Sequence, residues 1–343
     1  MSGSTESVSP PPSEVLVVGL NWLGDAVMSM PALQLFRAQH PDWRITMLAK
    51  PPLAGLWDMH QAVDDIQILE PGNRGVYTTA RRLTGERFDR AYILPNSFRS
   101  ALVPCLGGIR ERIGVRGAYR GFAINRPVQY SADRLARHQQ FEMCSVLGVD
   151  EPADGLPLPE LRVPAAELMK AEALLPSGPA PRLGCIPGAA RGSSKQWPEA
   201  HFVELIRRVL KESDARIVLL GTSIDEALCA RLVRAAESTD RVVNLAGATR
   251  LKTFAAVLSL LTAVVANDSG GMHLAAATGT PVFALYGMTD PAKTGPLGPH
   301  TQVLQKSERR CRDIPRVSPE AEAALASIRP EEVWECVKGS VCS

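Results

Sequence analysis

The chain has 343 residues, of which 45% are hydrophobic and 22% charged, and its formal net charge is +2. This length favours two globular domains, and the small net charge argues against general nucleic-acid binding. The seven scattered cysteines include no C-x-x-C pair, so the sequence indicates neither a disulfide framework nor a zinc site, and reduced cytosolic thiols are the simplest interpretation.

The N-terminal end has no feature of a signal peptide. Residues 1–13 are rich in serine and proline and lack an apolar core, so we expect a disordered tail. The longest apolar stretch, residues 254–266, is shorter than the roughly 20 residues that a membrane-spanning helix needs. A soluble protein is therefore expected, although it can still contact a membrane surface.

The first structured segment predicts a strand, a glycine loop and a helix. Residues 14–19 are a β-branched apolar run typical of a buried parallel strand, and residues 26–40 have helical spacing. Asp25 stands where the loop meets the helix, near the carboxyl end of the strand, which is where ligands bind open α/β sheets. It is a candidate general base, and the alternative is a helix N-cap.

Further strands are predicted at residues 44–48, 66–69 and 90–94, with helices between them, which indicates a doubly wound, mostly parallel sheet. An unusually basic section follows the third of these strands. Its side chains are either a solvated basic face or a cradle for an anionic acceptor, because guanidinium groups suit phosphate and carboxylate. The arginines are Arg99, Arg110, Arg112, Arg116, Arg120 and Arg126.

A change of composition between residues 148 and 181, rich in proline and alanine, marks the connection between two domains, with a short helix over 165–174. We expect the first domain over 14–165, the second over 166–320, and a C-terminal helix within 321–343 that packs back toward the first domain. The second half repeats the strand–loop–helix pattern. Its strands are predicted at 182–186, 216–220, 242–247, 263–266 and 281–286, and its helices at 199–212, 225–237 and 251–262.

Three loops of the second half, at 187–197, 221–225 and 268–273, are expected at the same edge of its sheet. In the last, an apolar strand ends in N-D-S-G-G-M-H directly before a helix, which offers backbone N–H groups and a positive helix end to a phosphate. The alternative is that Asp268 or Ser269 only caps the helix and the glycines only make the turn.

The other two loops carry further candidates. Lys195 is placed to reach a phosphate or is an ordinary surface lysine, and Asp225 suits a ribose hydroxyl or a helix cap. His273 is suited to contact the diphosphate or to pack beneath the loop. The sequence has no P-loop, no G-x-G-x-x-G, no G-x-S-x-G and no cluster with metal-ligand spacing, which argues against the enzyme classes that these motifs mark.

Several segments together resemble one family, the ADP-heptose:lipopolysaccharide heptosyltransferases. They are residues 17–31, 94–104, 187–198, 267–273 and 285–291, and the resemblance covers roughly residues 14–305. It implies a GT-B architecture, in which two Rossmann-like doubly wound domains face each other across a cleft. The acceptor is then expected on the N-terminal domain and the sugar nucleotide on the C-terminal one.

The resemblance also implies roles for individual residues. Asp25 matches the general base, Lys195 a phosphate ligand that assists catalysis, and Asp225 the residue at the adenosine ribose. The donor-binding residues expected are Gly188, Ser194, Thr222, Asp225, Asp268, Ser269, Gly270, Gly271, Met272 and His273. The acceptor-binding residues expected are Asn21, Trp22, Asn96, Ser97, Arg99, Arg116 and Arg120.

The activity implied is inverting transfer of L-glycero-D-manno-heptose from ADP-heptose to a heptose of the lipopolysaccharide inner core. No metal or other cofactor is expected, because Lys195 and the helix end would stabilise the departing ADP. The expected partners are the ADP-sugar and the core and lipid A acceptor at the cytoplasmic face of the inner membrane, and no nucleic acid.

Two departures from the family leave alternatives open. Gly271 stands where a bulkier residue, commonly leucine, is usual, and residues 311–328 match the family poorly. A GT-B transferase with a different sugar nucleotide or acceptor is one alternative, since a fold does not determine its substrate. Others are a nucleotide-sugar 2-epimerase and a non-catalytic relative that binds nucleotide or glycolipid.

Overall fold

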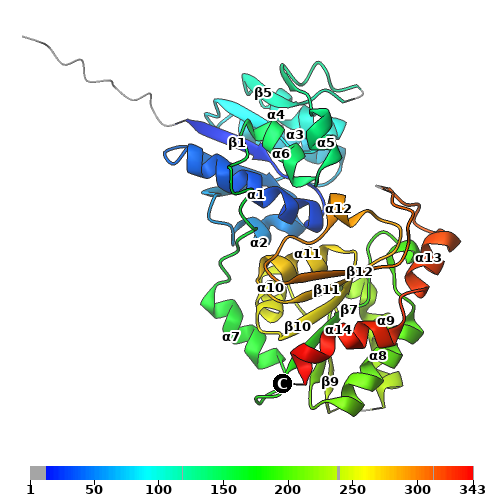
Figure 1. Ribbon diagram of the computed structural model, residues 1–343. Helices are drawn as coiled ribbons and strands as arrows, with labels where there is room; N and C mark the ends of the chain where they lie inside the picture. Colours follow the sequence, from blue (N-terminus) through cyan, green and yellow to red (C-terminus); the bar gives the residue numbers. More distant parts are fainter. Residues whose placement is uncertain (1–12, 118, 238–239, 312, 343) are drawn as a thin grey trace, which may run out of the picture.

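Two six-stranded parallel sheets, one in each half of the chain, form the frame of the molecule (Figure 1). The structure is a computed structural model and describes residues 13–117, 119–237, 240–311 and 313–342. The strand order is β3-β2-β1-β4-β5-β6 in the first sheet and β12-β11-β10-β7-β8-β9 in the second. The predicted pair of doubly wound Rossmann-like domains is therefore confirmed.

The first sheet is built from β1 (Glu14–Val18), β2 (Arg44–Ala49), β3 (Asp65–Ile68), β4 (Arg90–Ile93), β5 (Glu111–Val115) and β6 (Arg126–Val128). The second is built from β7 (Arg182–Ile186), β8 (Arg216–Leu219), β9 (Val242–Asn244), β10 (Ala263–Asn267), β11 (Val282–Tyr286) and β12 (Thr301–Gln305). The central strands β1 and β10 are apolar except for one end residue each, Glu14 and Asn267, because helices cover both faces of each sheet.

The helices of the first half are α1 (Leu23–Gln39), α2 (Ala54–Trp57), α3 (Gly72–Leu83), α4 (Phe98–Leu106), α5 (Ala132–Ala136) and α6 (Gln140–Leu147), with the 3₁₀ turn η1 (Pro51–Leu53). Those of the second half are α7 (Ala165–Leu174), α8 (Glu199–Glu212), α9 (Glu226–Ala236), α10 (Leu251–Ser259), α11 (Gly270–Ala277), α12 (Pro291–Thr294), α13 (Pro319–Ala326) and α14 (Pro330–Val341), with η2 (Ser193–Lys195) and η3 (Ser223–Asp225).

The strand order of each sheet reverses next to its first strand. β1 lies between β2 and β4, and β7 lies between β10 and β8, so the loops after β1 and β7 open at the topological switch points. Ligands of doubly wound sheets bind at such points, outside the carboxyl ends of the strands. The topology alone therefore places the 19–22 and 187–192 loops at the two candidate binding edges.

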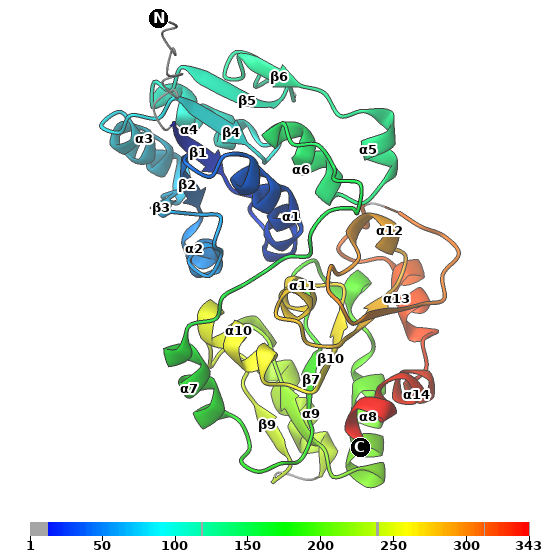
Figure 2. The ribbon, with the colours of Figure 1, turned by 60° about the vertical axis from the view of Figure 1, so that its left-hand side comes forward.

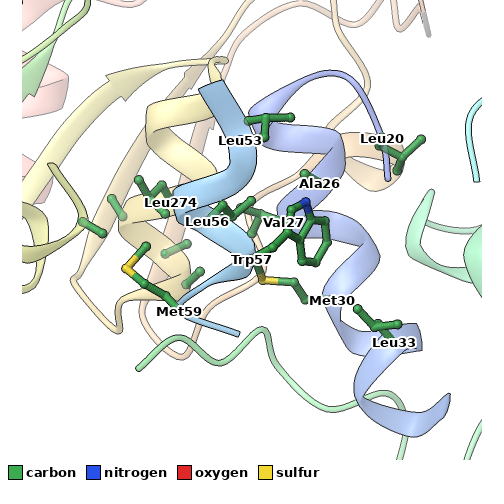
Figure 3. Close-up of a cluster of buried hydrophobic side chains, with 14 of the residues drawn as sticks. Leu20, Ala26, Val27, Met30, Leu33, Leu53, Leu56, Trp57, Met59 and Leu274 are labelled. Atoms are coloured by element: carbon green, nitrogen blue, oxygen red, sulfur yellow. The ribbon is translucent and has the colours of Figure 1, made fainter. Parts of the chain in front are cut away.

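The two halves share an apolar contact and are not joined by the linker alone. α1 packs against α11, and α2 packs against α10. Figure 3 shows Leu274 of α11 beside Leu56 of α2, with Trp57 and Met30 of the first half in the same buried cluster. The connection from α6 to α7 runs along the outside of this contact (Figure 2).

The C-terminal helix packs on the second domain, so the expectation that it returns to the first domain is wrong. α14 lies against α8, and its apolar side, Val333, Trp334 and Val337, shares a buried cluster with Phe202 and Leu205. The apolar face of α14 is thus buried within the second domain, and no apolar face is left on the described residues of the helix to pack against the first domain. The predicted tail falls on residues 1–13, of which 1–12 lie outside the described residues.

Candidate active site

A cleft of about 1510 Å³ lies between the carboxyl edges of the two sheets. The first domain lines it with the turn Trp22–Asp25, Met28 and the Pro52–Leu53 step. The second domain contributes all three of the loops that follow β7, β8 and β10. The loops that the sequence singled out in both halves therefore meet in one space.

Asp25 lines the cleft from the first turn of α1. The helix begins at Leu23 and Trp22 occupies the N-cap position, so Asp25 is the third helical residue and the N-cap alternative is wrong. A carboxylate in the first turn is stabilised in its ionised form by the positive end of the helix. Asp25 is thus a partly exposed carboxylate facing the second domain, where a substrate hydroxyl can reach it.

Lys195 and Asp268 form an ion pair on the opposite wall. The Nζ of Lys195 lies 2.5 Å from Oδ2 of Asp268, and the two side chains are only 13% and 8% exposed. Lys195 belongs to η2 after β7, whereas Asp268 directly follows β10, and these neighbouring strands bring the residues together over 73 positions. The pair shows that Lys195 is not an ordinary surface lysine.

Asn267 holds this arrangement together, a role that was not predicted from the sequence. Its Oδ1 accepts a hydrogen bond from the backbone N–H of Trp197 at 3.0 Å, and its Nδ2 donates to the carbonyl of Pro187 at 2.7 Å. Both ends of the loop after β7 are therefore fastened to the end of β10. The signal for this role was that a polar residue ends an otherwise apolar buried strand.

The N-terminus of α11 opens into the cleft. The N-cap residue is Ser269, and it makes no side-chain capping bond. Its buried Oγ has no hydrogen-bond partner within the part of the chain that the structure describes. Gly270 and Gly271 follow, and a Cβ on Gly271 would stand 2.9 Å from Cδ1 of Ile186. Ile186 therefore occupies space that a bulkier residue at position 271 would need.

His273 lies beneath this loop and is only 3% exposed. Burial lowers its pKa to about 4, and the positive charge of Lys195 acts in the same direction while the Asp268 carboxylate opposes it. The imidazole is therefore neutral at pH 7. Its ring also packs against Gly24 of the first domain. His273 consequently lines the cleft and joins the two domains.

Asp225 makes the capping interaction that the sequence offered as the alternative for it, and it also lines the cleft. Its Oδ2 accepts hydrogen bonds from the backbone N–H and the hydroxyl of Thr222, at 2.8 and 2.9 Å. Gly188 lies directly against this carboxylate, where a Cβ would collide with Oδ1. Thr222, Asp225 and Gly188 all line the same end of the cleft.

Two of the predicted donor contacts are not at the surface of the cleft. Ser194 is 1% exposed and Met272 is fully buried, and neither lines the space. Ser194 instead donates its backbone N–H to the carbonyl of Arg316. These two side chains support the loops from below.

The predicted acceptor residues separate into different environments. Trp22 is 51% exposed and lines the cleft. Asn21 and the exposed Asn96, Ser97 and Arg116 lie outside its lining. Arg99, also outside, donates a hydrogen bond to the carbonyl of Glu70.

Arg120 is wholly buried, so its assignment as an acceptor contact is wrong. Its guanidinium donates to the backbone carbonyls of Pro95 at 2.6 Å, Ser97 at 3.1 Å and Val115 at 2.9 Å. It joins the loop after β4 to the end of β5. Arg120 therefore has a structural role, because its guanidinium donates hydrogen bonds to carbonyl groups inside the domain.

Arginines from a distant part of the chain line the cleft instead. Arg191 and Arg316 face it, together with Asp313 and Val317, and none of these four was predicted from the sequence. No local motif indicates Asp313, Arg316 or Val317, because only the fold brings these residues to the cleft. Within the described ranges, no helix is long and apolar enough to cross a membrane, and no three metal-binding side chains come together.

Comparison with known proteins identifies the family. Residues 76–322 match glycosyltransferase family 9 (heptosyltransferase). Lipopolysaccharide heptosyltransferase 2 of Escherichia coli K12 is 32% identical over 311 residues, which cover 85% of this chain and 88% of that protein. Lipooligosaccharide heptosyltransferase 2 of Haemophilus influenzae is 32% identical over 342 residues, which cover 94% and 97% of the two chains.

A solved structure agrees with these sequence relatives. The structure of E. coli ADP-heptose LPS heptosyltransferase II superposes with a TM-score of 0.82 at 29% identity, covering 96% of this chain and 98% of that one. Both the GT-B fold and the resemblance drawn from the sequence motifs are confirmed. The chain therefore belongs to glycosyltransferase family 9, the heptosyltransferase family, and is a glycosyltransferase.

Proposed function

We propose that the protein transfers L-glycero-D-manno-heptose from ADP-heptose to a heptose of the lipopolysaccharide inner core, with inversion. One observation carries the proposal: Asp25 faces the Lys195–Asp268 pair and the N-terminus of α11 across a single cleft. A base on one wall and an anion site on the other are what a direct displacement of a nucleotide requires.

The reaction then divides between the two walls. Asp25 accepts the proton of the acceptor hydroxyl, whose oxygen forms a bond to the anomeric carbon as the bond to the ADP oxygen breaks. Lys195 and the free N–H groups of α11 stabilise the negative charge that grows on the departing diphosphate. This proposal uses no metal ion, because these protein groups supply the positive charge.

The nucleotide is proposed to lie along the carboxyl edge of the second sheet. Asp225 and Thr222, at the end of β8, are placed for the ribose hydroxyls, and the diphosphate follows toward β7 and β10. The names of the relatives support the choice of sugar. Both sequence relatives described above are called heptosyltransferase 2, and the superposed structure is of an ADP-heptose enzyme.

The acceptor is proposed to be the lipopolysaccharide core and lipid A, met at the cytoplasmic face of the inner membrane. An exposed aromatic pair on the first domain supports this: the rings of Phe98 and Phe122 lie 6.0 Å apart, with exposures of 45% and 64%. The exposed Arg116 precedes Phe122 in the same loop. Aromatic rings and cations together suit an anionic lipid surface.

Co-sedimentation with vesicles of anionic phospholipid tests this surface. The double variant Phe98→Ser/Phe122→Ser is expected to sediment less than the wild type. Met169→Ser removes a side chain that is 68% exposed, slightly more than Phe122, from α7 of the second domain and serves as the control. Equal sedimentation of all three proteins would contradict the proposed contact.

The central test is release of ADP from ADP-heptose, with and without a heptose-terminated core acceptor. The wild type is expected to release ADP only when the acceptor is present. Asp25→Asn should lower this rate by about 100-fold or more, because the amide cannot accept the proton. Asp42→Asn, in the exposed turn beyond the other end of α1, is the matched control and should retain full activity.

The other outcomes separate the alternatives. Full turnover by Asp25→Asn would contradict the role of the base. Binding of ADP without release from ADP-heptose would favour a transferase for another sugar nucleotide or a non-catalytic relative.

A further inference from the structure

The segment between β12 and α13 forms part of the wall of the cleft. Asp313, Arg316 and Val317 all line it. The family match spans residues 76–322 and so includes this segment, but residues 313–317 lie outside the motifs by which the sequence resembles the family. The contacts of residues 313–317 therefore indicate their role.

This segment is fastened to the loop after β7. The carbonyl of Arg316 accepts a hydrogen bond from the backbone N–H of Ser194 at 3.3 Å, and Nη2 of Arg316 donates to the carbonyl of Ala190 at 3.2 Å. Gly192 has a φ of +96°, and a Cβ there would collide with the carbonyl oxygen of Arg316. The close approach places Arg316 beside the loop that carries Lys195.

The charges that line the cleft are mostly neutralised within the protein. Lys195 pairs with Asp268, as described above. Arg191 pairs with Asp313 at 3.3 Å, and Arg231 pairs with Glu199 at 2.8 Å. Among the described residues, Arg316 forms no ion pair with a carboxylate, which distinguishes it from the other Lys and Arg side chains of the lining.

A further cation in this cleft would add to the stabilisation that Lys195 and the N-terminus of α11 give a diphosphate. The negative charge of Asp268 partly offsets that of Lys195, so the pair presents less positive charge to a ligand than an unpaired lysine would. A guanidinium has five N–H donors in a planar fork that matches phosphate oxygens, and the bond to Ala190 uses only one of them. Arg316 thus has both the charge and the donors for this task.

We propose that Arg316 is a binding residue for the diphosphate of the donor nucleotide. The inference rests on the proposed function, since it assumes that a nucleotide diphosphate occupies the cleft. The donor is favoured over the acceptor because Arg316 contacts the loop of the second domain that bears Lys195, whereas the acceptor is assigned to the first domain. The arginine belongs to the donor half of the cleft.

Isothermal titration of the full-length protein with ADP and with adenosine tests the proposal. Arg316→Ala is expected to weaken ADP binding by about tenfold or more, because a charged hydrogen bond is lost. Adenosine binding should be unchanged, since adenosine has no phosphate. Arg309→Ala is the control: this arginine follows the same strand, pairs with Glu320 and does not line the cleft.

Each outcome has a defined meaning. Unchanged ADP affinity in Arg316→Ala, or an equal loss for ADP and adenosine, would overturn the assignment. If the alanine variant fails to fold, Arg316→Gln replaces it, because glutamine is neutral and still has an amide donor for Ala190. A folded wild type that binds no ADP would contradict the proposed function itself, whereas normal binding by the wild type and both variants would contradict only the role of Arg316.

Discussion

Gly24 of α1 lies directly against the imidazole of His273 in α11, so closely that a Cβ on Gly24 would stand 2.7 Å from Cδ2 of His273. The two residues belong to different domains, and Gly24 immediately precedes Asp25. This contact therefore fixes how far the proposed base lies from the donor half of the cleft. Glycine is needed here because of the close approach and not because of its backbone angle.

Gly24→Ala is expected to push the start of α1 away from α11. Overpacking of this kind costs about 1–3 kcal/mol of unfolding free energy, and a shift of about 1 Å in a reacting group can cost on the order of 100-fold in rate. We expect kcat to fall much more than ADP affinity, since the donor loops lie in the second domain. Steady-state kinetics and titration with ADP measure the two effects.

The control for this variant is Gly339→Ala in α14, where a Cβ meets nothing within 4 Å. Alanine there should stabilise the protein by up to about 1 kcal/mol through its helix propensity and leave kcat unchanged. Wild-type kcat in Gly24→Ala would show that the contact between Gly24 and His273 does not position Asp25.

The Lys195–Asp268 pair is expected to behave as a buried unit. Lys195→Met leaves an unpaired carboxylate, and Asp268→Asn leaves an unpaired ammonium, so each single variant should lose about 3 kcal/mol of unfolding free energy. The double variant should lose clearly less than the sum of the two. Urea denaturation of the four proteins gives this coupling.

The pair Arg231–Glu199 supplies a matched control at the same cleft. Its side chains are 49% and 39% exposed, so the same cycle should yield a coupling below about 1 kcal/mol. Equal coupling energies for the two pairs would contradict the buried character assigned to Lys195 and Asp268.

His273 makes stability depend on pH in a defined direction. Burial holds its folded pKa near 4, below the ordinary value of 6.5, so between these values the unfolded chain takes up a proton that the folded protein does not. The unfolding free energy must therefore fall as the pH decreases through this window, and the contribution of His273 is fully present only above pH 6.5. Between pH 7 and 5 the loss amounts to about 2 kcal/mol.

Comparison of the wild type with His273→Asn isolates this contribution. The buried His60, whose pKa burial also lowers to about 4, adds a similar dependence, but it is present in both proteins and cancels. The variant should lose less stability than the wild type between pH 7 and 5. An identical pH dependence in the two proteins would show that His273 does not resist protonation in the folded state.

The sequence predicted those parts of the fold whose signal is local. The apolar strand at 182–186 and the amphipathic helix at 199–212 were predicted with the bounds that the structure has. The strands β5, β6 and β12 were missed because they lie toward the sheet edges and carry polar residues. β6 even contains Pro127, which only an edge strand tolerates.

The sequence predicted which loops form the site, but it did not predict which side chains in these loops pair with one another. Glycine, lysine and acidic residues after strands marked the loops, because the carboxyl edge of a parallel sheet gathers them. Which side chains pair depends on strand order, which brings Lys195 to Asp268 across 73 residues. The run of arginines likewise did not show that Arg120 points inward, nor that Arg316 reaches the cleft.

Arg120 and Arg116, four residues apart, should respond to substitution in opposite ways. Arg120→Ala removes the guanidinium that three backbone carbonyls accept from, leaving those buried groups unsatisfied, so we expect a loss of about 3 kcal/mol of unfolding free energy. Arg116→Ala changes an exposed side chain and should alter stability by less than about 0.5 kcal/mol. If Arg116 meets acceptor phosphates, its variant should instead raise KM for the acceptor with ADP affinity unchanged. Thermal unfolding and acceptor titration separate the two effects, and a stable Arg120→Ala protein would contradict the structural role assigned to Arg120.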